Sequence, residues 1–297
     1  MLPRELIKKI RRIQIVTSRR ADESFVGQYR SVFRGRGMEF DEVRAYAWGD
    51  DVRSIDWNVT ARTSIPHIKR FSEERELTVF LLVDVSGSQR FGSTDQLKSE
   101  VAAEVAALLA FSAIKNRDKV GALFFTDEVE KVLPPAAGPS HVLRVVREIL
   151  LFQPHGHGTD VAGALRYLGR ILKRRAIVFV VSDFLGPGLS ESELKGPLRR
   201  AARRHDVVAI RIRDPRELEL QKAGLVRMRD TETGEEAIFD LGSRRVRDHY
   251  REAAAARDRA FETTLARSGV DLISLQTDEP YELPLGRFFR DRARRAH

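Results

Sequence analysis

The feature of this sequence that most constrains its fold is an alternation of short apolar runs with helical patterns, which begins at Thr78. The apolar runs are rich in β-branched and aromatic residues and occupy residues 78–83, 120–125, 176–181, 206–212 and 270–275. Continuous apolar runs of this length are typical of strands that are buried on both faces. Strands of this kind, alternating with helices, predict an α/β fold with a doubly wound, mainly parallel sheet.

Between these runs the apolar residues recur at helical spacing, in residues 94–115, 141–152, 161–172, 190–204 and 245–268. Ser93 and Gln96 have the spacing of a capping box and predict the start of the first of these helices. Residues 225–228 and 237–239 flank a Thr-Glu-Thr-Gly turn, which predicts a β-hairpin inserted before the last helix.

The chain of 297 residues is long enough for one large or two ordinary domains with a substantial core. Residues 3–16 have the spacing of an amphipathic helix, and the stretch up to about residue 71 has only short strand-like runs, such as residues 38–46. We therefore divide the chain into an irregular N-terminal subdomain (1–74) that packs against an α/β domain (75–280), followed by a basic C-terminal tail (281–297).

The sequence favours a cytoplasmic protein. Basic residues interrupt residues 1–16, so that no continuous apolar region of an export signal is present. The most apolar stretch, residues 101–114, contains Glu104 and Ser112 and is shorter than the roughly 18 apolar residues that a membrane span needs. The absence of cysteine excludes disulfides, thiolate metal sites and a cysteine nucleophile, and is compatible with a reducing compartment.

Polar oxygen-bearing side chains follow three of the predicted strands and loops. The first strand ends in Asp84, and in an extended chain Ser86 and Ser88 would point the same way as this carboxylate. Thr159 lies in a glycine-rich loop before a helix, and Asp183 ends another strand. Carboxylate and hydroxyl oxygens suit Mg²⁺ or Mn²⁺, and doubly wound sheets bind ligands at this edge. The alternative is that the two serines and Asp84 only cap a turn and a helix.

The pattern Asp84-x-Ser86-x-Ser88, followed by Thr159 and Asp183, resembles the metal-ion-dependent adhesion site (MIDAS) of von Willebrand factor A domains. The upstream segment resembles the signature of the bacterial "domain of unknown function 58" family, through Gly35-x-Gly37-x-Glu39-Phe40, Arg44-x-Tyr46, Gly49-Asp50, Arg53-x-Ile55-Asp56-Trp57, Ala61-Arg62 and Phe71-x-x-Glu74. Members of that family commonly have transmembrane segments ahead of the signature, which this sequence lacks. The resemblance also implies an association with MoxR-type AAA+ ATPases.

Two carboxylates neutralise a divalent ion and leave a coordination position for an outside ligand, of which a partner's Asp or Glu is the natural example. We therefore expect a metal-dependent protein-interaction module, an adaptor for an AAA+ ATPase, rather than an enzyme. The alternatives are a metal-dependent hydrolase, which requires a general base near the metal, and a nucleic-acid-binding protein, which requires clustered Arg on one face. The net charge of +9 is compatible with the last alternative, and residues 199–204 and 287–295 are the candidate patches, although such runs are commonly solvated faces.

Two further motifs each allow two interpretations. His155 and His157 could bind zinc together with Asp183, but histidines in a glycine-rich loop are more often exposed. Residues 48–57 could form a docking surface for a partner. We favour instead a hydrogen-bonded scaffold that holds the N-terminal region on the sheet, with Trp57 in the core.

Overall fold

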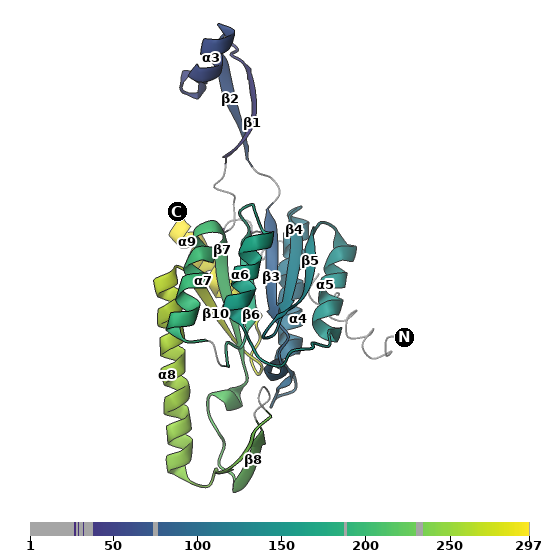
Figure 1. Cartoon of the computed structure of the whole chain (residues 1–297), viewed down its shortest axis with the longest axis vertical. Helices are drawn as coiled ribbons and strands as arrows, with labels where there is room; N and C mark the ends of the chain where they lie inside the picture. The colour runs from purple at the N-terminus through teal and green to yellow at the C-terminus, as the bar shows by residue number, and fades with distance from the viewer. Residues whose placement is uncertain are drawn as a thin grey trace.

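The computed structural model describes Gly27, Tyr29, Val32 and residues 38–73, 77–186, 189–229 and 234–296. At its centre is a six-stranded sheet with the order β10-β7-β6-β3-β4-β5 (Figure 1). Its strands are β3 (Thr78–Asp84), β4 (Lys119–Phe125), β5 (Val129–Ala136), β6 (Ile177–Ser182), β7 (Asp206–Arg213) and β10 (Asp271–Gln276). All neighbours pair in parallel except β4 and β5. The predicted doubly wound α/β fold is therefore confirmed, and the antiparallel edge strand β5 is an addition.

Helices cover both faces of this sheet (Figure 1). They are α4 (Lys98–Lys115), α5 (Pro139–Leu151), α6 (Val161–Ile171), α7 (Glu191–Arg204), α8 (Arg244–Ser268) and α9 (Glu282–Ala296). Alternate residues of each strand face opposite sides, so that Leu81 packs in a core with α4, α5 and α9, whereas Leu82 packs in a second core with α6, α7 and α8. Burial on both faces explains why these strands are continuously apolar.

The helix α4 begins four residues later than the sequence indicated. The predicted capping box at Ser93 and Gln96 is wrong, because α4 begins after Leu97, whose backbone N–H donates to Oε2 of Glu100 at 3.3 Å and whose side chain cannot cap the helix. The backbone N–H of Ser93 instead donates to Asp214, 2.6 Å away, in the loop after β7. The hydroxyl of Ser93 also donates to Asp214, at 2.5 Å, so a tertiary contact uses the side chain that local spacing assigned to a cap.

The C-terminal residues, which we expected to form a basic tail, fold as α9. Leu285 and Phe289 of this helix are fully buried, and the ring of Phe289 packs edge-on against Tyr29 with 6.4 Å between centroids. The apolar residues recur at positions 285, 288 and 289 and make one face of a helix, a pattern that the many arginines between them obscured. The helix predicted at residues 3–16 lies outside the described residues.

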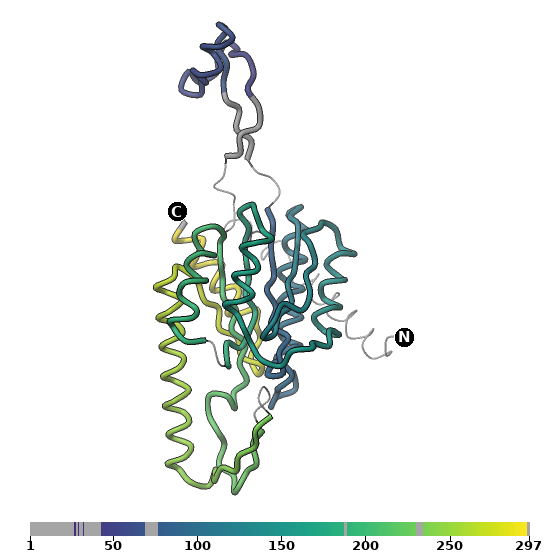
Figure 2. The backbone as a smooth tube through the Cα atoms, in the orientation of Figure 1, coloured from purple at the N-terminus to yellow at the C-terminus, as the bar shows by residue number. Residues whose placement is uncertain are grey.

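Two smaller units accompany the α/β domain. The predicted hairpin is present as β8 (Leu225–Arg229) and β9 (Glu236–Asp240), and leads into the long helix α8. A second hairpin, β1 (Met38–Ala45) and β2 (His67–Glu73), carries the helix α3 (Trp57–Thr63) at its tip and extends away from the sheet (Figure 2). Among the residues that the structure describes, no helix combines the length and apolar character needed to cross a bilayer.

The tip of the β1–β2 hairpin is internally braced but does not bury its aromatic residues. Arg44 and Asp50 form a bidentate ion pair at 2.7 and 2.8 Å, and Asp56 caps α3 through the N–H groups of two residues. The prediction that Trp57 lies in the core is wrong, because its surface is 70% exposed, and that of Trp48 is fully exposed. The acidic and basic residues of this segment brace it locally, as the sequence suggested. The expectation that the segment holds the N-terminal region on the sheet is wrong, because the hairpin extends away from the sheet and Trp48, Val52 and Trp57 face solvent.

Candidate functional site

The topology of the sheet brings Asp84 and Asp183 together. The chain leaves β3 toward β4 on one side and later returns to add β6 on the other side, so the strand order reverses between β3 and β6. Ligands of doubly wound sheets bind in the crevice at this point, beyond the carboxyl ends of the strands. Val83 pairs with Val181, and Ser182, which follows, donates from its hydroxyl to Oδ2 of Asp84 at 2.6 Å. Both aspartates are buried at this edge.

The two serines lie beside Asp84, although not on an extended strand as the sequence indicated. The chain bends after Ser86 into a 3-10 turn, η2 (Gly87–Arg90), and Ser88 lies in this turn. The hydroxyls of Ser86 and Ser88 are nevertheless 3.1 Å apart, and the N–H of Ser86 donates to Oδ1 of Asp84 at 2.9 Å. The turn thus places two hydroxyls and one carboxylate in a single buried cluster.

Thr159 is buried and lies just before α6, in the loop that meets the serine turn. The N–H of Gly87 donates to the carbonyl of His157 at 3.3 Å, which joins the two loops. Gly156 allows this loop to approach the sheet closely, since a Cβ there would lie 2.1 Å from Oδ1 of Asp127. The position of this loop places Thr159 at the same edge of the sheet as the other four predicted ligands.

The histidines of this loop are exposed, and their backbones rather than their rings are bound. The N–H of His155 donates to Glu130 at 2.9 Å and that of His157 to Asp127 at 3.1 Å. Within the described part of the chain, no three side chains of His, Asp or Glu form a cluster that could hold a metal ion. The alternative of a zinc site with Asp183 therefore gains no support, and a metal at this edge would depend on hydroxyl ligands as well as carboxylates.

The structure adds two residues that the sequence analysis missed. Lys98, the first residue of α4, is fully buried, and its Nζ donates to Oδ2 of Asp183 at 2.6 Å and also to Oε1 of Glu217. Glu217 ends the 3-10 turn η3 (Pro215–Glu217), and its other oxygen accepts from the N–H of Asp214 at 3.0 Å. A lysine at the first position of a helix is disfavoured by the helix dipole, and this was the one local signal that it has acidic partners.

The pKa values of Asp84, Lys98 and Glu217 reflect the fact that Lys98 pairs with Asp183 and Glu217 but not with Asp84. Burial, and then the charge of Asp183, raise the pKa of Asp84 to about 7, although hydrogen bonds from Ser182 and Ser86 oppose the shift. Burial alone would lower the pKa of Lys98, but the charges of Asp183 and Glu217 outweigh it and raise that pKa. Burial raises the pKa of Glu217 more than Lys98 lowers it. Asp84 is therefore the carboxylate that lacks a compensating cation.

The donor set at this edge fits a hard divalent cation. Two buried carboxylates and two hydroxyls are oxygen ligands of the kind that Mg²⁺ and Mn²⁺ take, and both ions commonly retain water molecules in addition. A cation beside Asp84 would also remove the cost of holding this buried carboxylate charged, a cost that its raised pKa expresses.

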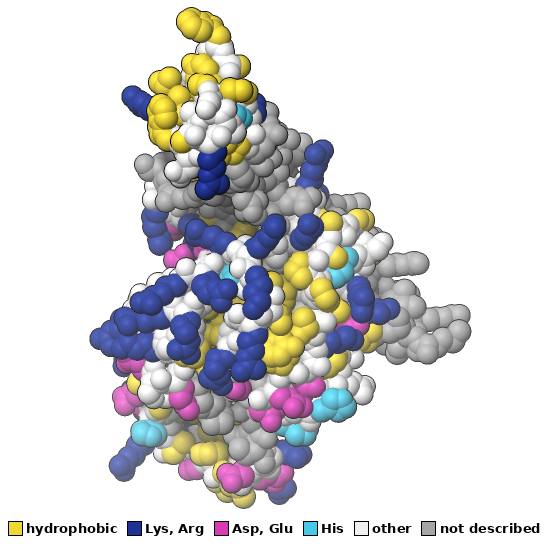
Figure 3. Space-filling model, turned by 45° about the horizontal axis from the view of Figure 1, so that its top comes forward, with side chains coloured by type: hydrophobic (Ala, Val, Ile, Leu, Met, Phe, Trp, Pro, Cys, Tyr) yellow, Lys and Arg dark blue, Asp and Glu magenta, His cyan; other side chains and the backbone are white. Residues whose placement is uncertain are grey.

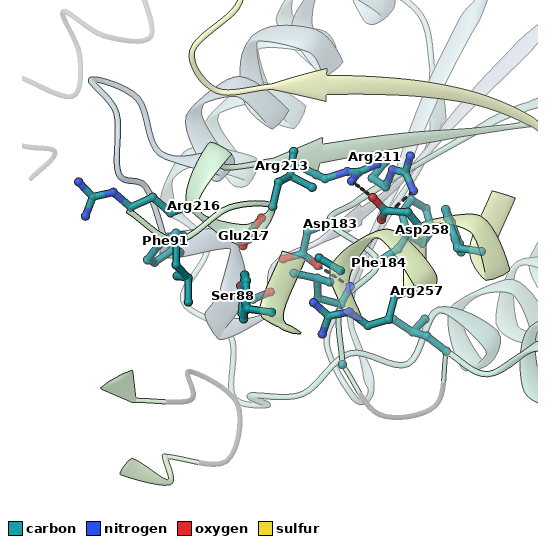
Figure 4. Close-up of a pocket in the computed structure, with 18 of the residues that line it drawn as sticks. Ser88, Phe91, Asp183, Phe184, Arg211, Arg213, Arg216, Glu217, Arg257 and Asp258 are labelled. Atoms are coloured by element: carbon teal, nitrogen blue, oxygen red, sulfur yellow. Dashed lines mark hydrogen bonds and ion pairs between the residues drawn. The ribbon is translucent and has the colours of Figure 1, made fainter. Parts of the chain in front are cut away.

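The edge opens into a cavity of about 1080 Å³ between the sheet, α8 and the β8–β9 hairpin (Figure 4). Ser88, Asp183 and Glu217 lie on its inner wall. The remaining lining is mixed, with aromatic, aliphatic and basic side chains that include Phe91, Phe184, Leu189, Phe261, Arg216 and Arg257. The rings of Phe184 and Phe261 pack at 4.6 Å between centroids and close the floor.

Two arginines of β7 lie in the wall of this cavity and bind side chains of neighbouring elements. Arg211 is buried and donates to Glu262 at 2.7 Å and to the hydroxyl of Ser274 at 2.9 Å. Arg213 pairs with Asp258 of α8. These contacts join the long helix α8 to the sheet beside the candidate metal ligands.

The strand order, the single antiparallel edge strand and the helices on both faces define a doubly wound α/β domain, which is the fold that the resemblance to von Willebrand factor A domains implies. Solved structures with a similar arrangement include an aerotolerance-related membrane protein from Bacteroides fragilis, at 13% identity and a TM-score of 0.49, over 74% of this chain and 99% of that one. Another is a von Willebrand factor type A protein from Catenulispora acidiphila, at 11% identity and a TM-score of 0.39, over 77% of this chain and 44% of that one.

Sequence comparison gives the family. The model for "Protein of unknown function DUF58" matches residues 42–260, and the chain belongs to this family. The uncharacterized protein Rv1480 of Mycobacterium tuberculosis is 34% identical over 294 residues, which cover 98% of this chain and 91% of that protein. The uncharacterized protein MAV169 of Mycobacterium avium is 36% identical over 143 residues, 48% of this chain and 82% of that protein. The family that the sequence resembles is thereby confirmed.

Proposed function

We propose that this protein is a metal-dependent protein-interaction module, and not an enzyme, in which Asp84, Ser86, Ser88, Thr159 and Asp183 hold Mg²⁺ or Mn²⁺. The observation that carries this proposal is the cluster of two buried carboxylates and two hydroxyls at the wall of a large cavity. The ion would supply a positive centre with room for one outside ligand. A partner's Asp or Glu side chain is the ligand with matching charge and hardness.

The cavity beside the site supports a protein ligand. It has room for side chains next to a metal-bound carboxylate, and its lining combines aromatic surface with Arg216 and Arg257. Apolar pockets with a few charged groups are typical of sites that anchor one side chain and orient its neighbours. The family resemblance suggests a MoxR-type AAA+ ATPase as the partner.

The alternative of a metal-dependent hydrolase finds less support in the site. Glu217 is a further carboxylate on the cavity wall; one of its oxygens accepts from the ammonium of Lys98 and the other from the N–H of Asp214. A general base has to be positioned against the attacking water, and pairing with a lysine makes a carboxylate a weaker base. Glu217 is instead bound into the scaffold that positions Lys98.

The test measures binding of a purified MoxR-type AAA+ ATPase by calorimetry, with Mg²⁺ and then with EDTA. We expect EDTA to abolish binding, and Thr159→Ala to weaken it by about tenfold or more because a ligand hydroxyl is lost. Val180→Ala is the control, since Val180 is buried in the sheet and its truncation costs on the order of 1 to 3 kcal/mol of stability without touching the site. Binding that is unchanged by both EDTA and Thr159→Ala would contradict a metal-bridged mechanism.

A further inference from the structure

A second surface of the molecule, away from the metal edge, carries a concentration of positive charge. Residues 161–182 and 194–205 contain ten Lys or Arg and no Asp or Glu. Nine of these basic residues are exposed, namely Arg166, Arg170, Lys173, Arg174, Arg175, Arg199, Arg200, Arg203 and Arg204. We call these nine residues the α6–α7 basic face.

The fold brings the two stretches together. Helices α6 and α7 lie side by side on one face of the sheet, and Nη1 of Arg204 donates to the carbonyl of Gly169 at 3.3 Å, across from one helix to the other. Arg204 and Arg175 both help to lower the pKa of buried His205, after burial itself, so their charges lie near the same point. Figure 3 shows Lys and Arg side chains in a broad band across the molecule, with Asp and Glu gathered below it.

Local structure accounts for only part of this charge. Arg170, Arg203 and Arg204 lie in the last turns of α6 and α7, where a cation interacts favourably with the helix dipole. Arg199 donates to the carbonyl of Arg267 in the last turn of α8, at 3.3 Å, and the other five residues have no such role. Of the nine, only Arg166 forms an ion pair with a carboxylate of the described residues, with Asp160 at 3.3 Å. The face therefore holds cations that the rest of the described chain leaves uncompensated.

The position and character of the face restrict what it can bind. Both helices begin at the metal edge and end at the opposite edge of the sheet, so the turn at residues 173–175 and the ends of both helices point away from Asp84 and Asp183. The exposed large apolar side chains all lie on other elements. Tyr167 of α6 is half-buried against the core beneath this face, so contact with the face is mainly electrostatic.

We propose that the α6–α7 basic face binds the surface of an anionic lipid bilayer and turns the metal edge away from it. The cations are spread in two dimensions, over two helices and the turn after α6, which suits a flat charged surface. A nucleic-acid duplex is a cylinder and would meet only one strip of such a face. Clusters of four to eight Lys or Arg attract anionic membranes, with about a fivefold gain in affinity for each residue near the surface.

The experiment measures co-sedimentation of the full chain with vesicles of about 30% phosphatidylglycerol in phosphatidylcholine, and with vesicles of phosphatidylcholine alone, over a range of salt concentrations. We expect binding to the anionic vesicles only, and a steep loss of binding as salt rises. A variant with Arg170, Arg174, Arg200 and Arg203 changed to Gln should bind roughly 600-fold more weakly, at about fivefold for each residue.

The control variant changes Arg227, Arg244, Arg245 and Arg251 to Gln, which alters the net charge equally at the β8–β9 hairpin and the start of α8. It should bind the anionic vesicles within about threefold of the unchanged protein. Equal losses in both variants would show a response to net charge alone and would overturn the proposal. The proposal would also be overturned if the anionic vesicles failed to bind, or if a 24-base-pair duplex bound more tightly than the vesicles at the same salt concentration.

Discussion

Replacement of Asp84 by Asn tests the electrostatics of the metal edge directly. The carboxylate of Asp84 is buried, faces the charge of Asp183, and has a pKa raised to about 7. A rise of this size corresponds to roughly 4 kcal/mol for holding the group charged in the folded protein. Asn keeps the size of the side chain but gives up part of the strength of the hydrogen bonds from Ser86 and Ser182. We therefore expect a net gain of about 1 to 3 kcal/mol in the metal-free protein above pH 7.

The dependence on pH has a definite sign. Because the pKa of Asp84 is higher in the folded protein than in the unfolded chain, the folded state binds the extra proton between about pH 4 and pH 7. Stability from this group is thus fully present below about pH 4 and is lost as the pH rises through about 7. Asp84→Asn should remove this decline, and Mg²⁺ should compensate it in the unchanged protein but not in the variant.

The assay is the melting temperature of both proteins from pH 4 to pH 8, with EDTA and with Mg²⁺. Asp183→Asn is the matched control. It also removes a metal ligand, but it deprives buried Lys98 of its partner at 2.6 Å and should destabilise the metal-free protein. If Asp84→Asn destabilises the metal-free protein at pH 8, or if its response to Mg²⁺ equals that of the unchanged protein, the charge of Asp84 does not control this site.

Two further predictions concern residues that the sequence did not single out. Lys98→Met should raise the affinity for Mn²⁺ by about tenfold or more in calorimetry, because the ammonium no longer competes for Asp183, while the metal-free protein loses about 3 to 5 kcal/mol of stability. A weaker affinity would mean that Lys98 orients the site for the ion. Phe289→Ala should cost about 3 to 5 kcal/mol in urea unfolding, because the ring is fully buried in the core beneath α9. A loss below about 1 kcal/mol would show that α9 is dispensable to the fold.

The sheet and most helices could be predicted because each depends on a pattern within a single segment. The strands at the centre are buried on both faces and are therefore apolar throughout, which few other structures require. The strand β5 was missed because it lies at the edge, is mostly half-buried and contains Pro134 and Pro135. The prediction that Trp57 lies in the core was wrong for a related reason. The alternating charges around Trp57 predict a locally hydrogen-bonded segment, but they do not determine whether the aromatic ring is buried or exposed.

Within the site, the predicted carboxylates and serines met because the ends of neighbouring parallel strands must lie at one edge. Lys98 and Glu217 could not be predicted in the same way. Lys98 contacts Asp183, which is 85 positions away in the sequence, and Glu217, which is 119 positions away. The contact with Glu217 depends on where the loop after β7 folds back over the start of α4. No pattern within a segment contains that information.

Lys98 and Glu217 make the two aspartates of the cluster unequal. Without them, Asp84 and Asp183 would both be buried carboxylates with no cation beside them. The structure instead gives Asp183 the ammonium of Lys98 and leaves Asp84 with neutral donors only, which is why its pKa is raised. A divalent ion at this edge would therefore supply to Asp84 the charge that Lys98 supplies to Asp183. It follows that Asp84 should govern whether the ion binds, and that Lys98 should govern how strongly it binds, so the two substitutions are expected to act in opposite directions on affinity.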